Sequence, residues 1–326
     1  MAATISVIMR TKDRPLLLAR ALRSVLAQTA SDFELVVVND GGDAAVLRKL
    51  MSDIGVAEDP RVEVIDNGAE PGRAGALDAG VDRAGGRYFA IHDDDDAWHP
   101  EFIERTCAYL DDHPTDAAVA THTEVVFEEI TDGVVAEVSR DLLAPEIDVA
   151  SLVETLWANY IPPIAMVLRR DVVDALGRFR PELPVLEDWE FNLRLLSQYT
   201  VGFIAGEPLA YWHQRKTSTG ADGNSVIADA RDHAMYNLLI RDDYLRRGLA
   251  GGESLGPLMA AAMMIRRIDR KADEARAHHQ KVIDMWGHAH QDQISALSQM
   301  MSLEIGRLRG EVLALRELVG RDGLTP

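Results

Sequence analysis

The sequence predicts an α/β domain with a mostly parallel sheet, followed by an all-helical C-terminal region. Short Val- and Ile-rich runs alternate with helical periodicity through the first hundred residues. Nearly continuous apolar strands of this kind are typical of parallel sheets that are covered by helices on both faces. After residue 223 the periodicity is helical throughout. Ligands of such sheets bind where the carboxyl ends of the strands meet.

The predicted elements alternate strictly along the chain. Each strand is a short run of β-branched and aromatic residues, and each helix has apolar residues at helical spacing. The predicted strands are residues 4–9, 33–40, 61–66 and 87–93, and the predicted helices are 15–28, 44–55 and 72–86.

Charge is distributed unevenly along the 326 residues, whose net charge is −19. Residues 1–220 carry 20 Lys and Arg against 38 Asp and Glu, whereas residues 221–326 carry 14 against 15. This excess of carboxylates argues against a nucleic-acid partner, which needs cations for its phosphates. If the acidic part binds a phosphate ligand, a divalent cation is the simplest way to shield the carboxylates.

The expected location is the cytoplasm. The single cysteine, Cys107, excludes an internal disulfide framework and fits a reducing compartment. No stretch approaches the ~20 apolar residues of a transmembrane segment. Peripheral attachment at the inner face of the membrane stays open as an alternative.

Polar residues follow three of the predicted strands. The first strand leads into "RTKDR" (10–14), the second into Asn39-Asp40-Gly41-Gly42, and the fourth into the four adjacent carboxylates of residues 93–96. Each alone has a structural explanation, because Asp40-Gly41 forms turns and Asp13 suits a helix cap. Together they predict a site at one sheet edge.

Two common phosphate-binding loops are absent from the sequence. The segment after the first strand, "MRTKDRP", contains no glycine, so it matches neither a dinucleotide fingerprint nor a Walker-type loop. A nicotinamide enzyme, a kinase and an NTPase are therefore disfavoured.

The chain resembles the family 2 glycosyltransferases, which have the Rossmann-like, nucleotide-sugar-binding GT-A fold. The matching pieces stand in the family's order and cover residues 4–220: "ISVIMRTKDR", "ELVVVNDGGD", "GRAGALDAGVDRAGGRYFAIHDDDDAWHP", "LEDWEFNLRLL" and "YWHQRKTSTG". The chain departs from the family pattern at Arg10, Lys12 and Asp78.

The resemblance implies that the acidic cluster is an Asp-x-Asp-type metal motif for Mg²⁺ or Mn²⁺. Asp95 is expected to bind the ion directly, and Asp93 or Asp94 to reach it through water or to contact the donor sugar. Asp96 is expected to lie behind them. A calcium loop is the alternative, but its ligands stand at alternate positions around a turn glycine, which is absent here.

The resemblance also implies a nucleotide-binding set. Asp40 matches the acidic residue that accepts the uracil imide N–H, which favours UDP, although guanine offers donors too. Thr11 matches a nucleotide contact, and Arg10 and Asp94 are assigned to the same set. Arg73 suits a phosphate or base contact, with a solvated first-turn arginine as the alternative.

The catalytic assignment rests on the pair Glu187-Asp188, which the family uses as its base. Asp188 is expected to take a proton from an acceptor hydroxyl, and Glu187 to orient it or to bind the acceptor. One base opposite one metal suffices for inversion. The structural alternative is that acidic residues simply favour a first helical turn.

Four further residues complete the expected site. His213 matches a family histidine near the metal and diphosphate, and Arg215 and Lys216 beside it are expected to contact the donor diphosphate. Trp189 is a weaker candidate for stacking on the acceptor. Trp189 also suits a core position.

The C-terminal part is predicted as a helical region, 221–290, and a short coiled coil, 291–320, that forms a homodimer. Two apolar series recur at seven-residue spacing, Ile294, Met301, Leu308 and Leu315, and Ile305, Val312 and Val319. This pattern favours a parallel two-stranded coil. Docking of this helix on its own domain is the alternative.

The expected activity is sugar transfer from a nucleotide-sugar donor to a hydroxyl of a glycan, lipid-linked or protein-linked acceptor, in surface polysaccharide or glycoconjugate synthesis of the bacterial type. Two other classes of protein are alternatives. A nucleotidyltransferase would show a glycine-rich triphosphate loop, and a non-catalytic scaffold would not need both acidic motifs.

Overall fold

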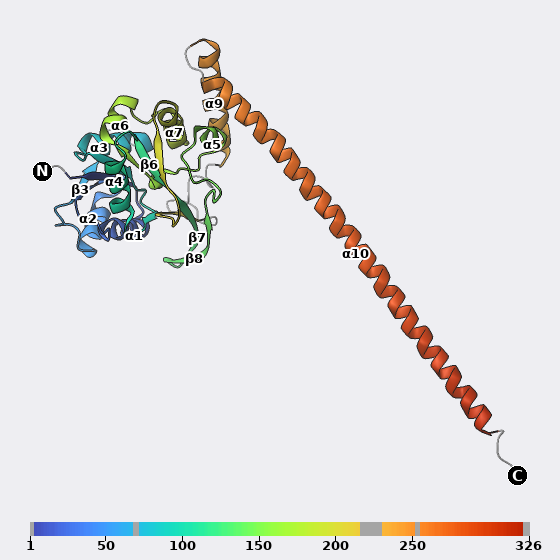
Figure 1. Cartoon of the computed structure of the whole chain (residues 1–326). Coiled ribbons are helices and arrows are strands. Elements are labelled where there is room, and N and C mark those ends of the chain that lie inside the picture. The colour runs from blue at the N-terminus through green and yellow to red at the C-terminus, as the bar shows by residue number, and fades with distance from the viewer. Residues whose placement is uncertain (1–2, 68–71, 216–229, 252–254, 322–326) are drawn as a thin grey trace. The chain divides into compact units, whose positions relative to one another are not determined.

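The computed structural model describes residues 3–67, 72–215, 230–251 and 255–321 (Figure 1). The chain divides into two compact units, Met1–Ala262 and Met263–Pro326. The first unit contains two sheets with their helices, and the second continues the long C-terminal helix.

The main sheet of the described chain has seven strands in the order β10-β6-β9-β4-β1-β2-β3. Its pairs are parallel except where β9 runs antiparallel to β4 and β6, which confirms the predicted mostly parallel sheet. The strands are β1 (Ile5–Thr11), β2 (Phe33–Asn39), β3 (Val62–Asp66), β4 (Tyr88–Ile91), β6 (Ala118–Thr121), β9 (Met166–Arg169) and β10 (Val201–Ile204).

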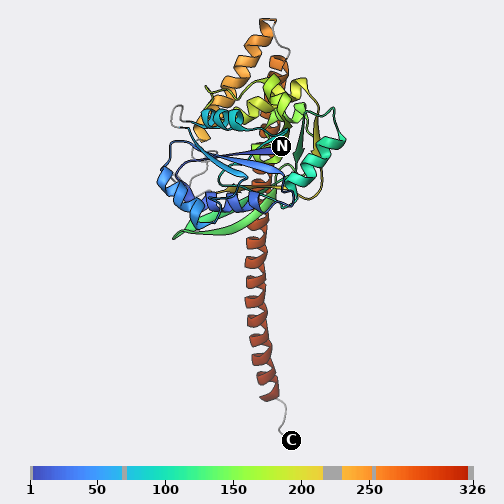
Figure 2. The same ribbon diagram turned by 90° about the vertical axis from the view of Figure 1, so that its left-hand side faces the viewer.

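Helices cover both faces of this sheet (Figure 2). One face carries α1 (Pro15–Leu26), α2 (Ala44–Asp53) and α4 (Phe102–Asp112), and the other carries α3 (Arg73–Arg83), α6 (Arg170–Leu176) and α7 (Glu187–Gln198). The helix α3 is rich in small residues because it lies close to β1. A Cβ atom on Gly80 would overlap the Ile8 side chain.

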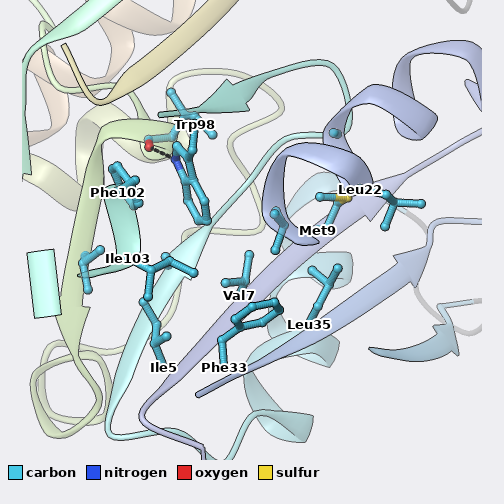
Figure 3. Close-up of a cluster of buried hydrophobic side chains, with 14 of the residues drawn as sticks. Ile5, Val7, Met9, Leu22, Phe33, Leu35, Trp98, Phe102 and Ile103 are labelled. Atoms are coloured by element: carbon cyan, nitrogen blue, oxygen red, sulfur yellow. Dashed lines mark hydrogen bonds between the residues drawn. The ribbon is translucent and has the colours of Figure 1, made fainter. Parts of the chain in front are cut away.

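Along each strand, successive side chains point to opposite faces of the sheet and so contribute to two separate cores. Ile5, Val7 and Met9 of β1 pack toward α1 and α4, together with Trp98 and Phe102 (Figure 3). The Trp98 indole nitrogen donates a 2.7 Å hydrogen bond to the carbonyl of Ile164.

A second, four-stranded sheet has the order β5-β11-β7-β8. The register of the β7–β8 pair shifts between Phe127 and Glu128, where Val138 of the partner strand is left without a counterpart. The strands are β5 (Ala97–Trp98), β7 (Thr123–Thr131), β8 (Val134–Leu142) and β11 (Ala210–Gln214). This sheet brings the segment before residue 216 against the loop that follows β4, because β11 pairs with β5.

Two helices follow the sheets, α9 (Ala230–Leu249) and α10 (Leu255–Arg321). Ile240, Tyr244 and Met259 form a small core with Leu193 of α7 and Leu156 of α5 (Leu152–Trp157). The first unit therefore extends to Ala262, beyond the boundary expected at residue 220. The short 3₁₀ helix η1 (Pro163–Ala165) precedes β9. Within the described ranges, no helix has both the length and the apolar character needed to cross a bilayer.

Candidate active site

The carboxyl ends of β1 and β4 bring cationic and acidic side chains together. The two strands pair in parallel, with Ile8 opposite Ile91, so the residues that follow them lie side by side. Arg10 Nε lies 2.9 Å from Asp93 Oδ1, and the Thr11 hydroxyl donates a 2.7 Å hydrogen bond to Asp94 Oδ2. Predicted nucleotide and metal residues therefore lie in direct contact.

Arginines hold the acidic cluster, defined as Asp93–Asp96. Arg14 Nη1 lies 3.1 Å from Asp94 Oδ1 and 3.3 Å from Asp95 Oδ2. Arg215 Nη2 pairs with the same oxygen of Asp95, and Arg20 donates to its backbone carbonyl. Cations from separate parts of the chain thus offset the repulsion between neighbouring carboxylates.

Glu128 of β7 is a buried acidic residue that sequence reasoning missed. Its carboxylate accepts from Arg20 Nη1 at 2.6 Å, from Arg215 Nη1 at 2.7 Å and, by Oε2, contacts His213 Nδ1 at 2.9 Å. Burial alone would raise the pKa of Glu128, but hydrogen bonds with His213 and Arg20 lower it to about 2. The one sequence feature that could have indicated Glu128 is the presence of a carboxylate at a position of an apolar strand that is expected to be buried.

Asp96 and His213 are both buried and are joined by a hydrogen bond. The backbone N–H of His213 donates a 2.9 Å hydrogen bond to Asp96 Oδ1, and the Asp96 residue is 2% exposed. Burial lowers the pKa of the His213 imidazole. Asp96 thus fixes the strand that carries His213.

The carboxylates of the cluster differ in how their charge is compensated. Burial raises the pKa of Asp94 to about 7, and the adjacent charge of Asp95 acts in the same direction. The same causes hold the pKa of Asp96 well above its usual range. Burial also acts to raise the pKa of Asp93, but the charges of Arg10 and Arg73 outweigh it and the net shift is downward. Within the cluster, the environment therefore favours the ionised form of Asp93 and the protonated forms of Asp94 and Asp96.

The pair Glu187-Asp188 opens α7 at the same sheet edge. Arg10 Nη1 lies 3.3 Å from Glu187 Oε1, so one guanidinium contacts both this pair and Asp93. Asn159 Nδ2 donates a 2.8 Å hydrogen bond to Asp188 Oδ2. Burial and the charge of Glu187 raise the pKa of Asp188 to about 6.

The first turn of α7 begins from a strained residue. Leu186 has φ 63° and ψ 18°, which lies in the left-handed region. Leucine rarely adopts this conformation, and such outliers are concentrated at functional sites. Leu186 packs against the small core of α7 and α9, so that core holds the strained backbone in place.

Asp40 joins the end of β2 to the start of α3. Its Oδ1 accepts from the backbone N–H of Gly72 at 2.8 Å and from Asn67 Nδ2 at 3.1 Å. Gly72 has φ 133°, and it directly precedes Arg73, whose carbonyl accepts from Arg10 Nη1 at 3.5 Å. The predicted nucleotide residues Asp40 and Arg73 are thus connected through the backbone.

Two expected contacts do not fit the structure. Trp189 is 1% exposed, its indole N–H donates to the Thr155 carbonyl at 2.6 Å, and the Arg241 guanidinium lies 4.7 Å from its ring, so it is a core residue rather than an acceptor platform. Arg215 is fully buried between two carboxylates, so it is not placed to contact a diphosphate. Lys216 lies outside the described residues.

The donor chemistry of the cluster fits a hard divalent cation. Mg²⁺ and Mn²⁺ prefer oxygen ligands, and Asp93 and Asp95 offer carboxylates with negative charge to neutralise. In the described part of the chain, no three acidic, histidine or cysteine side chains form a group that could hold a metal ion. A cation bound by one or two carboxylates and by ligand phosphates needs no such group.

These features define a class: an α/β protein whose strand ends combine ion-paired carboxylates with a second pair suited to accept a proton. The family model for glycosyl transferase family 2 matches residues 6–176. The chain belongs to this family and is a glycosyltransferase.

Relatives and a solved structure agree with this assignment. The chain is 28% identical over 277 residues to the uncharacterized glycosyltransferase YwdF of Bacillus subtilis, over 84% of this chain and 93% of that one. It is 26% identical over 201 residues to a PGL/p-HBAD biosynthesis glycosyltransferase of Mycobacterium tuberculosis, over 60% and 71%. The structure of S. aureus TarS 1-349 in complex with UDP-GlcNAc superposes with a TM-score of 0.53 at 17% identity, over 75% and 67%, and supports the fold.

Proposed function

We propose that this protein is a metal-dependent, inverting glycosyltransferase that uses a UDP-sugar. The supporting observation is the position of Arg10, which contacts Asp93 of the acidic cluster and Glu187 at the start of α7. The expected donor side and the expected base side therefore meet at one edge of the sheet, within the reach of one guanidinium.

On the donor side, Asp95 and Asp93 would hold Mg²⁺ or Mn²⁺ together with the donor phosphates, and the ion would supply positive charge against the departing diphosphate. His213, also expected as a ligand, would stay behind them, because its Nδ1 contacts Glu128. Asp94 is held by the Thr11 hydroxyl, which fixes the edge that the nucleotide contacts. Asp40 would accept the imide N–H of uracil.

The positive charge of Arg73 acts to lower the pKa values of both Asp93 and Asp188, so Arg73 lies near both groups of carboxylates. From this position its guanidinium would pair with a donor phosphate or stack on the base. Arg10 would complete the same set.

On the acceptor side, Asp188 would act as the base. The acceptor oxygen forms a bond to the anomeric carbon while the bond from that carbon to the diphosphate oxygen breaks, and Asp188 takes the hydroxyl proton. A single displacement inverts the anomeric configuration. Because Asn159 occupies Oδ2, the other oxygen of Asp188 is the expected proton acceptor.

The acceptor is proposed to be a hydroxyl of a glycan, a lipid-linked sugar or a protein-linked sugar, in bacterial-type surface polysaccharide or glycoconjugate synthesis. The name of the mycobacterial relative, which refers to PGL/p-HBAD biosynthesis, supports such a role. We place the reaction in the cytoplasm, with peripheral membrane attachment as its alternative.

The test combines a binding screen with a donor-hydrolysis assay. UDP-, GDP-, dTDP- and CMP-sugars are compared by thermal shift, with Mn²⁺ and with EDTA. We expect stabilisation by a UDP-sugar that requires the metal, and slow release of UDP. Stabilisation that is equal in EDTA, or none by any nucleotide sugar, would contradict the proposal.

We further propose that residues 291–320 pair with the same segment of a second copy. In the described part of this segment, Met301, Ile305 and Leu308 are 63%, 50% and 47% exposed. Glu304 contacts Arg307 of its own helix at 2.6 Å, so a partner's arginine would have to compete with it. Exposed pairs contribute only ~0.2–1 kcal/mol each, so the apolar seam would provide the stability.

Light scattering distinguishes dimerisation from docking within one chain. The full chain is expected to be a dimer, and a chain that ends near Gly287 a monomer. If the full chain is a monomer, or if the dimer persists after the truncation, residues 291–320 do not pair with the same segment of a second copy.

A further inference from the structure

The acidic residue Glu128 occupies a position that neither motif of the family explains. It lies on β7 of the second sheet and is 3% exposed. Its side chain contacts Arg20 of α1 and Arg215, which directly follows β11.

Two arginines connect Glu128 to Asp95 by separate routes. Arg215 contacts Glu128 Oε1 at 2.7 Å through Nη1 and the Asp95 carboxylate through Nη2. Arg20 contacts Glu128 at 2.6 Å and 3.1 Å and donates to the Asp95 backbone carbonyl. Both the backbone and the side chain of Asp95 are thus held by groups that Glu128 orients.

We propose that Glu128 is a positioning residue that keeps Asp95 competent to bind a divalent cation. It rests on the proposed function, because Asp95 matters in this way only if the cluster holds the metal. Glu128 fixes the two guanidinium groups and also takes a share of their charge. Without it, the positive charge of both arginines would act on Asp95 alone and would oppose a cation there.

This argument gives the direction of the effect. Replacing Glu128 with glutamine removes one negative charge beside two buried or half-buried arginines, while the shape of the side chain is kept. The affinity for Mn²⁺ should fall, and with it the metal-dependent affinity for UDP. In the described structure Asp188 contacts Asn159, whereas Glu128 contacts Arg20, His213 and Arg215, so proton transfer to Asp188 should be preserved.

The experiment measures Mn²⁺-dependent UDP binding by calorimetry in full-length protein. We expect Glu128→Gln to weaken binding at least about tenfold, the range seen when partners of metal ligands are lost. The matched control is Glu129→Gln, the exposed neighbour on the same strand, which should bind as the wild type does. Excess Mn²⁺ should restore turnover of Glu128→Gln, and the acidic limb of its pH profile should not move.

The outcomes separate this proposal from the proposed function. If the wild type binds no UDP with Mn²⁺, both are refuted. If the wild type binds and a folded Glu128→Gln binds equally well, only the role of Glu128 is refuted. Should Glu128→Gln fail to fold, Glu128→Asp provides the test, because the shorter side chain keeps the charge but cannot hold Arg20 and Arg215 in the same positions. Unchanged binding in folded Glu128→Asp would overturn the proposal.

Discussion

The acidic cluster and the pair Glu187-Asp188 are two groups of carboxylates at one sheet edge with different partners. Guanidinium groups contact the cluster: Arg10 and Arg215 each contact one of its carboxylates, and Arg14 contacts two. In the pair, Arg10 contacts only Glu187, whereas Asp188 has the neutral amide of Asn159.

The two groups differ in their contacts and not in how readily they ionise. Asp94 contacts Arg14 and Asp188 contacts a neutral amide, yet burial raises the pKa of Asp94 to about 7 and that of Asp188 to about 6. A hydroxyl could approach Asp188 beside this neutral amide, which suits the role expected of a base.

The largest expected effect follows from removing the proton acceptor. Asp188→Asn keeps the shape and the hydrogen bond from Asn159, but it cannot take a proton, so turnover should fall ~10²–10⁴-fold. Donor binding, measured by calorimetry, should persist. If Glu187→Gln were the more damaging change, the base would be the other member of the pair.

Removing Asp95 should instead weaken donor binding, which the Asp188 variant is expected to keep. Asp95→Ala should weaken Mn²⁺-dependent UDP binding roughly 10–100-fold, because it removes the expected metal ligand. Asp112→Ala, an exposed aspartate on α4, is the control and should bind normally. Equal UDP affinity of the Asp95 variant and the wild type would show that the two groups do not differ in this way.

The pH dependence of turnover sharpens the comparison further. A base must be deprotonated to act, so kcat/KM should fall about tenfold per pH unit below about pH 6, where Asp188 becomes protonated. A base with the ordinary value of 3.8 would keep activity down to about pH 4. A pH–rate profile at saturating Mn²⁺ measures the limb, and a limb near pH 4 would contradict the assignment.

The smallest expected effect is on stability. The pKa of Asp188 is raised on folding, so the folded state binds more protons and the free energy of unfolding falls as the pH rises from about 4 to about 6. Asp188→Asn removes this loss and should be more stable than the wild type at pH 7 by about 1–2 kcal/mol. Urea unfolding at pH 4 and pH 7 measures the difference, which should disappear at the lower pH.

Sequence patterns predicted the parts of the site that depend on local order. The ends of successive parallel strands meet at one edge, so Thr11, Asp40 and Asp93 could be placed there from periodicity alone. Glu128 could not, because it reaches the site through a second sheet and pairs with Arg20, 108 positions away. Whether Trp189 stacks on the acceptor or lies in the core could not be decided from the sequence for a similar reason. The helix that covers it, α9, follows much later in the chain.

The left-handed conformation of Leu186 restricts which residues can stand just before α7. Val or Ile would meet a steric penalty at φ 63°, while Gly or Asn would accept the backbone but lose the contact with the core. Residue 186 must therefore accept a left-handed backbone and also fill a place in the core, and few residue types do both. Because that core includes side chains of α9, the direction in which α7 starts depends on α9 as well.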